Sequence, residues 1–148
     1  MPLHVSAQRG DGARSAGGRD AVGIVERAAR AALMARGVHD AEVSVTLLGD
    51  LAIATLNRRW LQREGPTDVL AFPLFEDGEA PVGDVYIGIR QAMRQAAALG
   101  VPPAEELARL AIHGTLHVLG FDHPDGVRRE TSRMWREQER ILAGMTRS

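Results

Sequence analysis

The 148-residue sequence contains no cysteine and no lysine. Without cysteine, the chain has no disulfide bond, no thiolate metal ligand and no cysteine nucleophile. Because all 18 basic residues are arginine, it also lacks the lysine of a Schiff-base enzyme and the lysine of a phosphate-binding P-loop. These absences exclude several large enzyme classes before any motif is considered.

Long apolar runs and strong net charge are also missing. No run approaches the roughly 20 residues of a membrane-spanning helix, and the N-terminal "MPLHVSAQRGDG" has no apolar signal core. We therefore expect a cytoplasmic protein with no membrane association. The net charge of -1 means that any surface for nucleic acid must be a local patch. A chain of this length is expected to form one domain, residues 1–148.

Apolar periodicity and turn residues predict four strands and five helices in the order βαβαββααα, an α+β fold. The nearly continuous apolar run at 67–75 predicts a central strand, and Asp50 is expected to cap the second helix. The helix at 102–119 is apolar on almost every side, which is typical of a buried helix. Strands are expected at 3–8, 42–48, 67–75 and 82–89, and helices at 20–36, 50–61, 90–99, 102–119 and 126–143.

Histidine is concentrated in one stretch, "HGTLHVLGFDH", which holds three of the five histidines. His113 and His117 are four residues apart, so on a helix both rings leave the same face. Gly120 allows the chain to leave the helix in a left-handed conformation and to bring His123 back over that face. Three imidazoles around an open position for water are typical of catalytic zinc, although Ni, Cu and Co also accept three imidazoles.

The spacing of these histidines matches that of the metzincin peptidases and predicts a zincin-like metal-binding helix. Those peptidases carry glutamate directly after the first histidine as the general base, whereas this chain has Gly114 there. The carboxylate that would activate water against an amide is therefore missing. Three unrelated histidines are the alternative, but burying them without a shared ligand would leave several polar groups to satisfy.

Three motifs resemble the YbeY family of bacterial metal-dependent endoribonucleases: the histidine stretch, "LNRRW" followed by "GPTDVLAFP", and "VGDVYI". The resemblance extends from about the second strand to the last helix. It implies helices packed on a small mixed four-stranded sheet and a metal held by His113, His117 and His123. It also implies cleavage of single-stranded RNA, maturation of the 16S rRNA 3′ end and ribosome quality control, with rRNA and the ribosome or its proteins as partners.

One position departs from the family pattern. The family usually carries arginine directly after the aromatic residue of the "LN" block, where this chain has Leu61. Arg58, Arg59 and Arg63 lie close by and are candidates for binding RNA phosphates, with Arg59 also a catalytic candidate; a solvated helix face is the alternative. On a helix, Arg59 and Arg63 would share a face, so these two are expected to replace the missing arginine.

Three carboxylates are further candidates. Asp84 leaves its strand on the face opposite Val85 and Ile87, and it or Asp68 can hold the free nitrogen of a ligating histidine. A hydrogen bond at a strand end is the alternative for both. Asp122, inside the ligand turn, either activates water as a catalytic residue, serves as an outer ligand or caps the turn.

The expected chemistry is zinc-assisted hydrolysis, in which the metal lowers the pKa of bound water and polarises a phosphoryl oxygen. Attack by the 2′-hydroxyl of the RNA is equally compatible with the sequence, which does not identify a general base. Two other functions stay open: a metallopeptidase or other metallohydrolase, and a non-catalytic ribosome-binding factor whose metal only stabilises the fold.

Overall fold

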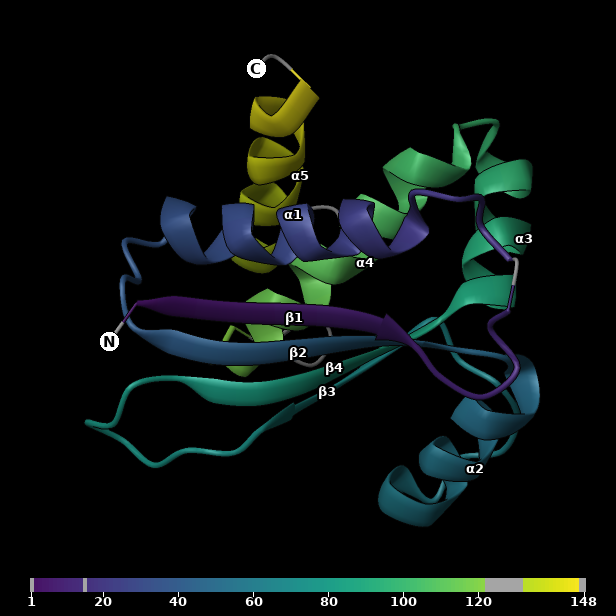
Figure 1. Ribbon diagram of the computed structural model, residues 1–148, viewed down its shortest axis with the longest axis horizontal. Helices are drawn as coiled ribbons and strands as arrows, with labels where there is room; N and C mark the ends of the chain where they lie inside the picture. Colours follow the sequence, from purple (N-terminus) through teal and green to yellow (C-terminus); the bar gives the residue numbers. More distant parts are fainter. Residues whose placement is uncertain (1, 15, 122–131, 147–148) are drawn as a thin grey trace.

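The computed structural model describes residues 2–14, 16–121 and 132–146, and within them five helices pack on a four-stranded mixed sheet (Figure 1). The predicted element order and the α+β class are confirmed. The strands are β1 (Leu3–Arg9), β2 (Ala41–Leu48), β3 (Val69–Pro73) and β4 (Val82–Gly88). The helices are α1 (Ala21–Ala35), α2 (Asp50–Leu61), α3 (Ile89–Leu99), α4 (Pro103–Val118) and α5 (Arg133–Thr146).

The strand order in the sheet is β1-β2-β4-β3, with β1, β2 and β4 parallel and β3 antiparallel to β4. The prediction of a central strand at 67–75 is wrong, because β3 lies at the edge. Its continuous apolar run has another cause: Leu70 packs with Ile53 of α2 on one face, while Val69 and Ala71 pack on the main core on the other. Pro73, which cannot donate a backbone hydrogen bond, ends the strand.

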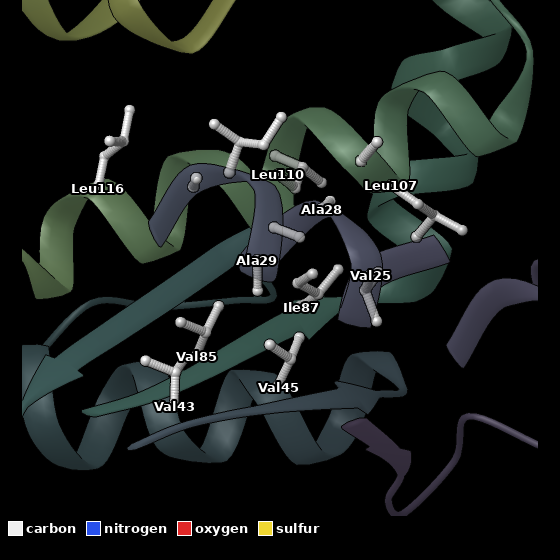
Figure 2. Packing of buried hydrophobic residues seen from close by; sticks show 14 of the residues in the cluster. Val25, Ala28, Ala29, Val43, Val45, Val85, Ile87, Leu107, Leu110 and Leu116 are labelled. Carbon is white, nitrogen blue, oxygen red and sulfur yellow. The ribbon is translucent and has the colours of Figure 1, made fainter. Parts of the chain in front are cut away.

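The main core lies between the sheet and a layer formed by α1 and α4, while α2 lies on the opposite face of the sheet (Figure 1). Valine and isoleucine side chains of β2 and β4 point toward these helices (Figure 2). Full burial of each such side chain contributes roughly 1.5–3 kcal/mol. The sheet residues that Figure 2 labels in this layer are Val43, Val45, Val85 and Ile87, all fully buried.

The helix ends differ from prediction in two places. The N-cap of α2 is Gly49, not Asp50, whose carboxylate instead pairs with Arg94 at 3.0 Å. The predicted start of the last helix at Gly126 lies outside the described residues, and within them α5 begins at Arg133. The hydroxyl of Ser132 accepts a hydrogen bond from the backbone N–H of Trp135 at 3.0 Å and so caps α5. No helix in the described parts of the chain is long and apolar enough to cross a membrane.

Close packing of α4 on the sheet depends on two glycines. A Cβ atom on Gly114 would lie 2.5 Å from Cγ1 of Val85, and one on Gly83 of β4 would lie 2.6 Å from Cγ1 of Val118. Such distances are far below normal van der Waals contact, so the absence of both side chains lets the helix lie directly on the strands. Gly114 therefore faces the sheet, and a glutamate at this position would be directed into β4 rather than toward solvent.

We expect Gly114→Ala to lower the free energy of unfolding by about 1–3 kcal/mol, because its methyl group would force α4 away from Val85. Gly144→Ala is the matched control: a Cβ atom at this position of α5 would point into open space, so alanine should be neutral or stabilise the helix by up to about 1 kcal/mol. Urea unfolding measures both. Equal stabilities of the two variants would contradict the close contact.

Candidate metal centre

The last two turns of α4 bring two imidazole rings together. Nε2 of His113 lies 3.1 Å from Nε2 of His117, with the ring planes inclined by 75°. The ring of His113 is buried and that of His117 is half-buried. The four-residue spacing therefore places both Nε2 atoms on one side of the helix, as the sequence predicts.

The distance between the two nitrogens can be compared with that in a zinc site. Two imidazole ligands at 2.0–2.1 Å from a tetrahedral zinc ion stand about 3.3–3.4 Å apart. The observed 3.1 Å is close to this separation, and both atoms that face each other are imidazole Nε2 atoms, which commonly bind metals. The pair thus fits two ligand positions on one metal ion.

His123 and Asp122, the other predicted residues of this centre, lie outside the described residues. Gly120, just before them, has the predicted left-handed conformation with φ 99°. The guanidinium groups of Arg36 and Arg133 lie over the ring of Phe121, at 4.8 and 5.5 Å from the ring centroid. Within the described ranges, no set of three His, Asp or Glu side chains is placed to hold a metal ion. Of the three histidines predicted as ligands, the structure describes His113 and His117.

The partner of His113 comes from a residue that the sequence reasoning missed. Oε1 of Gln138, on α5, lies 2.6 Å from Nδ1 of His113, and both side chains are buried. A signal was present in the sequence: Met134, Gln138 and Ile141 follow helical spacing, and this periodicity places a glutamine at a core position. A buried amide at such a position requires a polar partner.

Gln138 belongs to a larger buried network centred on Arg109. The guanidinium of Arg109 donates to Glu139 through Nε at 3.0 Å and through Nη2 at 3.2 Å, and to Glu106 through Nη1 at 2.7 Å. Burial alone lowers the pKa of Arg109, but the hydrogen bonds and charges of Glu139 and Glu106 outweigh burial and raise it above its ordinary value. Arg109 therefore stays charged, and its guanidinium group only donates hydrogen bonds.

Asp68 and Asp84, the two carboxylates predicted to hold the free nitrogen of a ligating histidine, lie in different places in the structure. Asp68 lines the same cavity of about 520 Å³ as His113 and Gln138, so it lies near the candidate centre. Asp84 does point away from Val85, as predicted, but that face of the sheet is opposite α4, and Asp84 accepts a hydrogen bond from Ser44 at 2.8 Å there. Asp84 is therefore not brought to the histidine pair, and Gln138 takes the position expected for it.

The arginine candidates also lie apart from the histidines. α2 ends at Leu61, and Gln62 turns the chain with φ 53°. The prediction that Arg59 and Arg63 share a helical face is therefore wrong, because Arg63 follows the end of the helix. The guanidinium of Arg59 lies 5.6 Å from the centroid of the Trp60 ring, which is 57% exposed.

Comparisons with known proteins match the chain to one family model and to relatives that carry the same name as that model. The family model described as "Endoribonuclease YbeY" matches residues 15–146. Relatives of that name from Azorhizobium caulinodans and Moorella thermoacetica are 42% and 41% identical; the alignments cover 85% and 86% of this chain and 82% and 88% of theirs. The solution structure of a Thermotoga maritima protein, 26% identical, matches with a TM-score of 0.62 over 98% of this chain and 91% of that protein.

We expect Arg109→Met to lower the free energy of unfolding by about 3 kcal/mol, because it leaves the buried carboxylate of Glu106 and the carboxylate of Glu139 without their cation. Arg94→Met is the matched control. Its pair with Asp50 is solvent-exposed, and such pairs contribute about 0–1 kcal/mol. Chemical unfolding of both variants checks the difference; a loss at Arg109 no larger than at Arg94 would contradict a buried network.

Proposed function

Because the chain belongs to the YbeY family of endoribonucleases, we propose that it cleaves single-stranded RNA at a metal ion held by His113, His117 and His123. The supporting observation is the 3.1 Å separation of the Nε2 atoms of His113 and His117, which suits two ligands of one zinc ion. We further propose that its substrate is rRNA, in maturation of the 16S 3′ end and ribosome quality control, with the ribosome or its proteins as partners.

A zinc ion bound there would supply Lewis-acid chemistry toward a phosphoryl oxygen and water. Described residues next to the histidine pair would form the surroundings of this ion. His113 is fixed by Gln138, and Asp68 provides a carboxylate on the wall of the adjoining cavity. Because Glu106 in the same cavity is already bound by Arg109 and Gln95, Asp68 is the better placed of these two carboxylates to hold the attacking hydroxyl or water. Asp122 stays a prediction for this role.

RNA binding is proposed for the end of α2. Arg58 and Arg59 can bind phosphates bidentately, and the exposed ring of Trp60 offers a surface for stacking a base. Since α2 and α4 lie on opposite faces of the sheet (Figure 1), an RNA that reaches both must pass around an edge of the sheet. This placement favours RNA binding over a catalytic role for Arg59.

The peptidase alternative finds no support in the packing of α4. In the zincin pattern the general base follows the first histidine, but Gly114 at that position faces Val85 across the closest helix–sheet contact. Glycine supplies no carboxylate, and any larger side chain there would meet Cγ1 of Val85. A non-catalytic ribosome-binding factor is the remaining alternative, and it differs from the nuclease in showing binding without cleavage.

The first test measures the metal content of the purified protein. Purified protein is expected to carry about one transition metal ion per chain, and His117→Ala is expected to lose most of it, since one ligand of an open three-histidine site is removed. His39→Ala, at an exposed histidine, is the matched control and should keep it. Full occupancy of the His117→Ala protein would refute the site.

Cleavage is tested with a fluorescent single-stranded RNA, a duplex of the same sequence and unfolded casein. We expect cleavage of the single strand alone, abolished by a chelator and restored by zinc, because the reaction needs a Lewis acid at the phosphate. Tight RNA binding without cleavage would favour the binding factor, and chelator-sensitive cleavage of casein would favour the peptidase. Either result overturns the proposal.

The arginines are tested by the salt dependence of RNA binding. The double variant Arg58→Ala/Arg59→Ala should bind more weakly, and the slope of log K against log salt should fall by about 1.4, because two fewer phosphates of a single strand are neutralised. Leu61→Arg should add little, and Arg19→Ala, an exposed arginine before α1, is the control. An unchanged slope in the double variant would show that these residues do not bind phosphate.

A further inference from the structure

We propose that Arg109, Glu139 and Gln138 form a hydrogen-bond chain with only one possible direction, and that this chain keeps the proton of His113 on Nδ1 and its lone pair on Nε2. The three are positioning residues that prepare a metal ligand before any metal is bound. The inference rests on the proposed metal site for its purpose, while the hydrogen-bond chain itself can be tested in metal-free protein.

The direction is set at Arg109. A guanidinium group donates hydrogen bonds and cannot accept them, and a carboxylate only accepts. Arg109 contacts both carboxylate oxygens of Glu139, at 3.0 and 3.2 Å. It is anchored from the other side by Glu106, which is 3% exposed. The Glu139 carboxylate is thus held in place next to a permanent cation.

Glu139 in turn orients the amide of Gln138. Oε2 of Glu139 lies 2.9 Å from Nε2 of Gln138. If the amide were rotated by half a turn, its carbonyl oxygen would face the carboxylate, and two acceptors would repel each other. The NH₂ group must therefore point to Glu139, which leaves Oε1 of Gln138 facing Nδ1 of His113 at 2.6 Å.

An amide oxygen only accepts, so Nδ1 of His113 must carry the hydrogen of this bond. In a neutral imidazole the other nitrogen then has the lone pair. That nitrogen is Nε2, the atom 3.1 Å from Nε2 of His117, and in the metal-free pair His117 supplies the hydrogen between them. His113 therefore presents its lone pair toward the candidate metal position without any rearrangement.

Burial makes this arrangement persistent. Gln138 is 2% exposed and His113 is 7% exposed, so water has little access to either partner, and a change of tautomer would set two acceptors or two donors against each other. The last two helices, α4 and α5, are joined at this point. The link explains how a helix that contributes no metal ligand among its described residues can still decide how well a metal binds.

The test uses the full-length protein and two variants. Gln138→Leu removes the acceptor for Nδ1 at similar volume. The double variant Gln138→Glu/Glu139→Gln exchanges the two side chains: the new carboxylate accepts from His113 and from the new amide, and the amide oxygen accepts from Arg109. It preserves the net charge, the acceptor facing Nδ1 of His113 and the acceptor facing Arg109, while the hydrogen bond between positions 138 and 139 reverses its direction. Gln8→Leu, on the exposed face of β1, is the control for replacing a glutamine by leucine.

The first measurement is the tautomer of His113, read from ¹⁵N chemical shifts of the imidazole in metal-free protein. The wild type, the double variant and Gln8→Leu should show the proton on Nδ1, and Gln138→Leu should shift it wholly or partly to Nε2. Circular dichroism and urea unfolding establish that each variant is folded. A folded Gln138→Leu protein with the wild-type tautomer would overturn the proposal.

The second measurement is zinc affinity, by competition with a chromophoric chelator. Gln138→Leu should bind zinc about 10- to 100-fold more weakly, as is typical when a partner of a ligating histidine is lost, and the double variant should recover most of the affinity. Wild-type affinity in Gln138→Leu, or no recovery in the double variant, would refute the role assigned to the chain. A wild-type protein that has the expected tautomer but binds no zinc would instead refute the proposed metal site.

Discussion

The structure depends on how closely α4 lies on the sheet. Gly114 and Gly83 leave out the side chains that would keep the helix away from Val85 and from β4. Close contact on that side fixes the rotation of α4 about its axis. Around the helix axis, His113 and His117 lie on the same side of Gly114, at roughly 100° and 60° from it, so the remaining neighbours of α4 can reach them.

Those neighbours are polar where a core is normally apolar. Glu106, Arg109 and Gln138 are buried or nearly so at the junction of α3, α4 and α5, and burying such groups is costly unless each finds a partner. Here each carboxylate has a partner: one arginine pairs with several carboxylates, and Gln95 donates a further hydrogen bond to Glu106 at 2.8 Å. A buried network of this kind is rigid, which suits residues that must hold an imidazole in one orientation.

The sequence predicts much of this molecule, because strands, helices and the histidine pair follow from local periodicity. It fails where the answer depends on contacts between distant segments. The apolar run of β3 indicates burial on two faces but not a central position, and the spacing of Arg59 and Arg63 assumes a helix that Gln62 ends. Asp84 has the chemistry of a histidine partner, yet only the sheet topology shows that it lies on the other face.

The same topology separates the two proposed tasks of the protein. The helices of the main core, on one face of the sheet, carry the histidine pair and its hydrogen-bond partners; α2, on the other, carries Arg58, Arg59 and the exposed Trp60. β3 is an edge strand whose residues pack on the main core on one face and with Ile53 of α2 on the other, so an RNA that passes around this edge could reach both sets. An extended single strand can bend around such an edge, whereas a stiff duplex cannot, and this difference gives a physical reason for the preference for single-stranded RNA that we propose.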